Sequence, residues 1–238
     1  MTTKATDVLQ RVVWLLQDES IRWSAAELVT WLNDAQTAAQ ALRPDVTEVI
    51  ASVTLSPGAL QSLYDYDAAL PQPPVKLMKV TRNTSLEGRR RAIRLVSREI
   101  MDVVKPDWQS APPATDAVNY MVDVNLPAAF WIYPPAPVGT DPKMPAMSVE
   151  IHYSAAPRRL DPPAPDKTWA DTLGDISVRD RFAMVLVDYV LYRAYMKDAE
   201  FGGNGSRAKT HFDLFQSALM ADVQGTMVAQ PTAKQATA

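Results

Sequence analysis

The sequence predicts an α+β protein, a helical bundle formed by N- and C-terminal α-hairpins with an antiparallel β domain inserted between them. Three observations support this fold class: apolar residues recur at steps of three and four near both ends, they alternate at period two in the middle, and all but one of the 19 prolines lie between Pro44 and Pro165. Proline is excluded from helix interiors and central strands because its ring fixes φ and it lacks an N–H. The expected boundaries are 1–45 and 166–224 for the helical bundle, 46–165 for the inserted β domain and 225–238 for a flexible C-terminal tail.

The N-terminal segment predicts two helices joined by a short turn. Apolar side chains between residues 6 and 17 share one helical face, and a Thr-Asp pair at its start can cap it. Ser24 and Glu27 have the spacing of a capping box, and the apolar positions that follow step by four and three until Leu42. We therefore expect an α-hairpin that ends before the first proline.

The middle of the chain predicts a small antiparallel sheet. Short stretches rich in valine, isoleucine and aromatic residues indicate β-strands at 47–55, 75–81, 118–124, 129–133 and 147–153. Proline-rich loops, including residues 134–137, separate some of these strands. One helix is expected at residues 97–104, because the Lys-Pro pair that follows stops it.

Helical periodicity returns beyond the prolines. Ser177 and Asp180 resemble a second capping box, and the helix that follows them is expected to be about 20 residues long. That helix is apolar on nearly every face, so neighbouring helices must surround it. A glycine-rich turn at 202–205 precedes a last helix that Ser206 can cap. Each terminal hairpin is too small to stand alone, and we expect the two to form a four-helix unit.

Composition excludes several classes of chemistry. Of the 238 residues 47% are apolar, and 24 basic against 27 acidic side chains give a net charge of −3. The absence of cysteine rules out disulfides, thiolate-bound metals and a cysteine nucleophile. The sequence also lacks a P-loop, a dinucleotide-binding fingerprint and a zincin motif. We expect no cofactor, no bound metal and no enzymatic activity.

The two histidines and one acidic pair offer little for catalysis. His152 falls in an alternating strand and His211 on the outer side of the last helix, and neither has an acidic or hydroxyl partner at motif spacing. Asp65 and Asp67 lie two residues apart ahead of a proline loop, which is typical of a solvated turn. We interpret all four as surface residues.

No signal peptide or membrane span is expected, because Asp188 and Arg193 interrupt the longest apolar segment. These two charges need partners, since burying an unpaired charge is unfavourable by several kcal/mol. Each is expected either to pair within the bundle, with a residue such as Arg22 or Asp34, or to face another copy of the chain. The sequence leaves both alternatives open.

Basic residues are concentrated in one part of the chain. Between Lys76 and Lys105 there are nine basic against three acidic residues, a local charge of +6, so the remainder carries −9. This segment predicts a subunit interface, with DNA contact or an ordinary solvated face as alternatives. A free-standing DNA-binding domain would be basic overall, which this chain is not. The candidate interface or channel patch consists of Arg82, Arg89, Arg90, Arg91, Arg94 and Arg98.

A different class of function is also compatible with the sequence. The β domain contains aromatic residues that, if exposed, would grip carbohydrate or a peptide: Trp108, Tyr120, Phe130, Trp131 and Tyr133. Aromatic residues at strand spacing more often form a core. A hydrolase that uses acidic pairs is a weaker alternative, because no histidine or carboxylate constellation supports it.

Three segments, in the same order, resemble the head-to-tail adaptor (tail tubular protein A-like) family of short-tailed bacteriophages. Residues 22–35, RWSAAELVTWLNDA, followed by RPD at 43–45, resemble the opening of those proteins. Residues 130–135, FWIYPP, resemble part of their β region. The segment YVLYRAYMKD, at residues 189–198, is similar to their closing helical hairpin together with residues 208–215. The resemblance covers nearly the whole chain.

The resemblance implies a structural role without catalytic residues. Such adaptors form homo-oligomeric rings, typically of twelve copies, in the virion neck between the portal protein and the tail tube or nozzle. Genomic DNA passes through the centre, where only weak and non-specific contact is expected. The resemblance further implies that the helical part and an extended C-terminal segment contact the portal, that the β domain faces the tail, and that the chain is made in the host cytoplasm.

Overall fold

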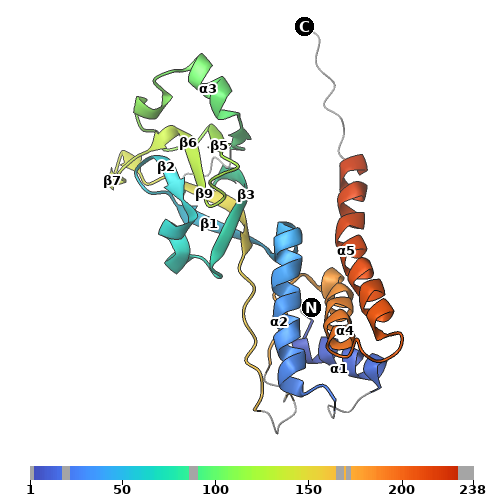
Figure 1. Cartoon of the computed structure of the whole chain (residues 1–238). Helices are drawn as coiled ribbons and strands as arrows, with labels where there is room; N and C mark the ends of the chain where they lie inside the picture. The colour runs from blue at the N-terminus through green and yellow to red at the C-terminus, as the bar shows by residue number, and fades with distance from the viewer. Residues whose placement is uncertain (1–2, 18–21, 86–90, 165–168, 170–172, 230–238) are drawn as a thin grey trace. The chain divides into compact units, whose positions relative to one another are not determined.

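The protein folds into two compact units, each with its own core (Figure 1). The helical unit comprises Met1–Val46 and Pro157–Ala238, and the β-unit comprises Thr47–Ala156. The mixture of helices and sheets confirms the α+β class. The computed structural model describes residues 3–17, 22–85, 91–164, 169 and 173–229.

Four α-helices contribute to the core of the helical unit. They are α1 (Ala5–Leu16), α2 (Ala25–Leu42), α4 (Ala183–Lys197) and α5 (Asn204–Ala229). Helix α4 contacts the other three, whereas α1 and α2 touch each other little. The side chains of Leu186, Val190 and Leu191 are buried along α4, as its all-round apolar sequence predicts.

Of the two capping boxes that the sequence predicts, one is present in the structure and the other is not. The predicted capping box is present: the Ser24 hydroxyl accepts a bond from the Glu27 N–H, and the Glu27 carboxylate accepts from the Ser24 N–H. The second capping box is wrong. The Ser177 hydroxyl instead accepts from the Arg158 N–H at 2.8 Å, and Asp180 accepts from the Thr3 N–H at 2.6 Å.

Helix α4 is therefore shorter than predicted, and α5 is longer. A 3-10 turn, Asp180–Phe182, precedes α4, which has 15 residues. Helix α5 begins at Asn204, inside the predicted glycine turn, and continues to Ala229. The predicted start of a flexible tail at residue 225 is wrong for 225–229, which are helical, while 230–238 lie outside the described residues.

The segment after the β-unit packs with the helical unit, so the second boundary lies at Pro157 rather than near residue 165. The Asn33 amide on α2 donates to the Leu160 carbonyl and accepts from the Leu160 N–H, both at 2.8 Å. Leu160 itself is buried in the core of the helical unit. One polar side chain thus satisfies both backbone groups of a buried, non-helical residue.

Arg43, at the end of α2, joins three elements of the helical unit. Its guanidinium donates two bonds to the Asp45 carboxylate, at 2.7 and 2.9 Å, and a third to the Leu219 carbonyl in α5 at 2.9 Å. The same group stacks over the Phe182 ring, 4.9 Å from its centroid. Burial acts to raise the pKa of Asp45, but the hydrogen bonds and charge of Arg43 outweigh it and hold that pKa below its usual range. The pair therefore stabilises the fold at neutral pH and loses this contribution as the pH falls below about 4.

The β-unit contains two sheets that share a core. Strands β1 (Glu48–Thr54), β9 (Ser148–Ala155) and β3 (Pro74–Asn83) form one sheet in that order. The second has the order β2 (Gly58–Ser62), β6 (Ala129–Ala136), β5 (Asn119–Val122) and β4 (Arg94–Leu95). Apart from β4, which pairs parallel to β5, the strands of both sheets pair antiparallel as predicted, but they form two sheets rather than one.

The second sheet is buried on both faces. On one face, Phe130 and Ile132 of β6 join the core shared with the first sheet. On the other, Trp131 packs in a second cluster with Met101 and Trp108, beneath the short helix α3 (Arg98–Val104). Tyr120 is buried in the first cluster as well. Four of the five candidate ligand-binding aromatics are therefore core residues, which removes the surface that the carbohydrate or peptide alternative requires.

Residues 134 and 135 lie in a strand, although the sequence predicted a proline loop. The Val118 N–H donates to the Tyr133 carbonyl at 2.8 Å, and the Ala114 N–H donates to the Pro135 carbonyl at 3.2 Å. Neighbouring segments thus supply the N–H donors of these hydrogen bonds, so a proline in the strand only has to supply a carbonyl acceptor. Here proline's missing N–H does not prevent a strand.

We predict that Asn33→Ala lowers the free energy of unfolding of the helical unit by about 2 kcal/mol, because it leaves both backbone groups of Leu160 without partners. Urea denaturation followed by circular dichroism measures the change. The matched control is Thr37→Ala, one turn along α2, whose hydroxyl bonds only to a carbonyl of its own helix. That variant should change stability by less than about 0.5 kcal/mol. Equal losses in the two variants would contradict the role given to Asn33.

Candidate functional site

The described arginines of the predicted basic patch lie on several elements of the β-unit. Arg82 lies on β3 in the three-stranded sheet, whereas Arg94 lies on β4 in the other sheet and Arg98 begins α3. Arg89 and Arg90 lie outside the described residues. The segment just before β4 pairs with the end of β3: Arg82 bridges to Ala92, and the Asn83 N–H donates to the Arg91 carbonyl at 3.0 Å.

Arg82 is neutralised within the sheet. Its guanidinium donates to Glu150 on β9, with Nη2 at 2.6 Å from the carboxylate. The Thr81 hydroxyl bonds to the same carboxylate at 2.6 Å. These hydrogen bonds, from Thr81 and from Arg82, hold the pKa of Glu150 below its usual range. Glu150 therefore remains charged and offsets Arg82 at neutral pH.

The arginines near α3 have different surroundings. Arg98 stacks over Trp131, 4.7 Å from the ring centroid, and lies 3.8 Å from Asp102. Arg91 and Arg94 are exposed, and no acidic side chain in the described part of the chain forms an ion pair with them. These two residues are thus the part of the predicted patch that remains available to a partner.

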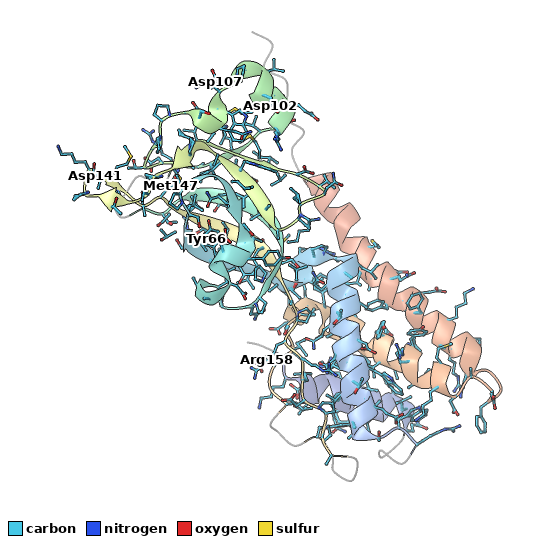
Figure 2. The ribbon with its side chains drawn as sticks, turned by 60° about the vertical axis from the view of Figure 1, so that its left-hand side comes forward. Tyr66, Asp102, Asp107, Asp141, Met147 and Arg158 are labelled. Carbon is cyan, nitrogen blue, oxygen red and sulfur yellow. The ribbon has the colours of Figure 1, made fainter. Side chains whose placement is uncertain are left out.

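Around α3, at the end of the β-unit where Figure 2 labels Asp102 and Asp107, several apolar side chains are exposed, and we call them the tip surface. Val124 is 94% exposed and Val103 is 81% exposed. The tip surface consists of Leu95, Ile100, Val103, Val104, Val122, Val124 and Leu126. Beside it lies a groove of about 600 Å³ between the β4–α3 connection, residues 95–102, and the end of β5, residues 122–125. Monomeric proteins rarely expose contiguous apolar patches of this kind unless they bind a partner.

The local sequence explains why this surface stays exposed. Helix α3 has the sequence REIMDVV, and among its seven residues only Met101 is buried. Trp108 closes the cluster beneath it by donating from Nε1 to Asp102 at 2.7 Å. A helix of two turns can present only one face to the sheet, so its other apolar residues remain in solvent. The apolar content of α3, greater than one face can bury, is the sequence signal for this surface.

Asp188 and Arg193 both have partners within the helical unit. Arg193 lies 3.6 Å from Asp34, as one of the alternatives predicted. Asp188 Oδ1 lies 2.9 Å from His211 Nδ1. Both residues therefore pair within the helical unit, and Arg22, the other neighbour considered, pairs with Asp198.

The histidines have acidic neighbours that sequence spacing did not indicate. His152 is 9% exposed, with Nδ1 at 2.6 Å from Glu48 Oε1 on the adjacent strand. His211 also stacks on Tyr195, with ring centroids 5.7 Å apart. The interpretation of His152 as a surface residue is therefore wrong, whereas His211 is half-buried against α4. Cross-strand and cross-helix neighbours, far apart in sequence, supply the carboxylates.

The described residues contain neither a membrane-spanning helix nor a metal-binding cluster. Within the described ranges, no helix has both the length and the apolar content needed to cross a bilayer. Across those same residues, no group of three or more histidine, aspartate or glutamate side chains is close enough to hold a metal ion. The tip surface, Arg91 and Arg94 are therefore the candidate functional features of the described residues.

Comparison with protein families assigns the chain to a known family. The family model described as SU10 adaptor protein matches residues 3–235, which include both units. No curated protein shows significant similarity to the chain. The match thus spans the three segments in which the sequence resembles phage adaptors.

We predict that the ion pairs of the helical unit differ strongly in their contribution to stability. Arg43 is 6% exposed, so Arg43→Ala should lower the free energy of unfolding by about 3 kcal/mol, because the Asp45 carboxylate and the Leu219 carbonyl lose their donor. Arg193→Ala removes a partly exposed pair and should cost less than about 1 kcal/mol. Thermal and urea denaturation compare the two variants. A larger loss for Arg193→Ala would show that Arg43 is not the stabilising contact.

Proposed function

We propose that this chain, which belongs to the SU10 adaptor protein family, joins the portal to the tail of a short-tailed bacteriophage. The family is one of phage head-to-tail adaptors, so the protein is a structural component of a virion that interacts with other virion proteins such as portal and tail. The observation that carries the proposal is the match over residues 3–235, which leaves neither unit unaccounted for. The proposal assigns no catalytic residue.

The proposed assembly is a homo-oligomeric ring in the neck between capsid and tail, and the resemblance to head-to-tail adaptors supports twelve copies. A closed ring needs heterologous contacts, in which one face of a subunit meets a different face of the next. Each contact must bury on the order of 1,000 Å² or more to be stable. Because the chain has no cysteine, disulfides cannot link its subunits, and buried surface must hold them together. The tip surface supports the proposal because it supplies exposed apolar area for such a contact.

We further propose that Arg91 and Arg94 contact a neighbouring subunit or line the DNA channel. Both are exposed and lack an acidic partner among the described residues. If they face the channel, their contact with DNA must be weak and salt-sensitive, because the genome has to slide past. The net charge of −3 is consistent with a protein that does not hold DNA tightly.

The adaptor proposal predicts the mass of the particle. The purified chain should be either a monomer that assembles on the portal or a high-order ring, and mixing it with the portal of its phage should give a stable complex. Native mass spectrometry and electron microscopy of the mixture measure this. A strict dimer that does not bind portal would contradict the proposal.

The arginine proposal has a matched charge-reversal test. Arg91→Glu with Arg94→Glu should impair ring formation on the portal at least tenfold in the concentration required, while leaving the melting temperature unchanged. The control is Lys76→Glu with Lys79→Glu, which makes the same charge change on exposed positions of β3. Normal assembly by the arginine variant, or equal impairment of both variants, would remove Arg91 and Arg94 from the interface.

A further inference from the structure

We propose that the hairpin formed by β7 (Thr140–Asp141) and β8 (Met144–Pro145) of one copy docks in the groove beside the tip surface of the next copy. This inference rests on the proposed ring and names the two surfaces that meet in it. The occupant of the groove is a second copy of the chain.

The hairpin exposes apolar side chains that are available to a partner outside its own unit. Its two strands pair only with each other, two residues to a side. A two-stranded hairpin is marginally stable in water without further packing. Val138 at its base is 70% exposed, and Met144 on β8 is 37% exposed. The hairpin thus presents apolar side chains for which its own β-unit provides little cover.

The neck of the hairpin has a fixed, narrow geometry. Gly139 has φ +76°, and a Cβ there would lie 2.7 Å from the Cβ of Ala146 across the neck. Only glycine allows the two sides to approach this closely. At the turn, the Asp141 carboxylate accepts from the Lys143 N–H at 2.8 Å, which orders the tip and leaves the Lys143 side chain exposed.

The groove complements the hairpin in polarity and charge. Its apolar lining includes Leu95, Val122 and Val124. Its charged lining consists of Arg98, Glu99, Asp102 and Asp123, which give a local excess of acidic residues. The hairpin carries one charge of each sign: the Asp141 carboxylate is bound to the Lys143 backbone N–H, and the exposed Lys143 ammonium is the group that can meet the acidic lining. Complementary charge favours the correct register, while the apolar side chains supply the buried area.

The two surfaces lie at different edges of the β-unit, so a hairpin cannot fill the groove of its own chain. Figure 1 shows β7 projecting from one edge and α3 at another, and Figure 2 shows Asp141 and Asp102 apart in a second view. A projection and a groove on different faces of one unit make a heterologous contact, which repeats from copy to copy. This is the kind of contact that a closed ring requires.

Engineered cysteines test the contact without background, because the chain contains no cysteine. Met144→Cys places a thiol on the hairpin and Val124→Cys places one in the groove, both at exposed positions. The full-length double variant, assembled with portal if portal is required, is oxidised and run on a non-reducing gel. We expect a ladder of dimers, trimers and larger species, and an equimolar mixture of the two single variants should give heterodimers only.

The controls separate this contact from random collision. Met144→Cys combined with Ile50→Cys, which places the second thiol on exposed β1, should give less than a tenth of the cross-linked product. Rings seen by electron microscopy without cross-linking, or a dimer formed by Met144→Cys alone, would overturn the hairpin contact and leave the adaptor proposal standing. Failure of the unsubstituted chain to assemble, with or without portal, would overturn both.

Discussion

The burial of β5 and β6 on both faces is the constraint on which the β-unit depends. Alternate side chains of β6 enter two different cores, with Phe130 and Ile132 on one side and Trp131 on the other. The first core attaches this sheet to the three-stranded sheet, and the second holds α3 in place. Since β6 leads directly toward the β7–β8 hairpin, the same strand fixes both the groove and the hairpin within one rigid framework.

Strand pairing, rather than proximity in the sequence, decides which charged side chains of the β-unit lie close together. Within the basic segment, Arg82 on β3 meets Glu150 on β9, which is 68 positions away in the sequence. A charged residue that pairs across strands contributes to the sheet and has little left for a partner. The backbones of Arg91 and Arg94 pair with neighbouring segments, but their exposed side chains form no ion pair among the described residues and keep their charge available for assembly.

The sequence predicted most helices and longer strands but few of the features that make the surface. Apolar periodicity located α1, α2 and β9 because each buries one continuous face over several turns or residues. The strands β4 and β7 have two residues each, which is too short for any period to be seen. Their positions follow from tertiary packing, as does the parallel pairing of β4.

The sequence of α3 shows more apolar residues than one helical face can bury, but it does not show which of them are exposed. Ile100 and Val103 have the same residue types as core positions, and only the neighbours of α3 decide that Met101 is buried and they are not. The sequence did indicate that the function lies in surfaces, because it offers no cysteine and few histidines. It did not indicate which surfaces, since exposure depends on contacts between distant segments.

Placing a groove and a projection on one unit has a geometric consequence for assembly. If successive copies meet through the hairpin and the groove, the rotation between them is set by the internal geometry of the β-unit, which its two cores hold rigid. The helical unit then does not have to define the curvature of the ring, and its exposed residues remain available for other virion proteins. A closed ring of fixed copy number requires this precision in one repeated contact, because a small error in rotation accumulates around the circle and yields an open filament.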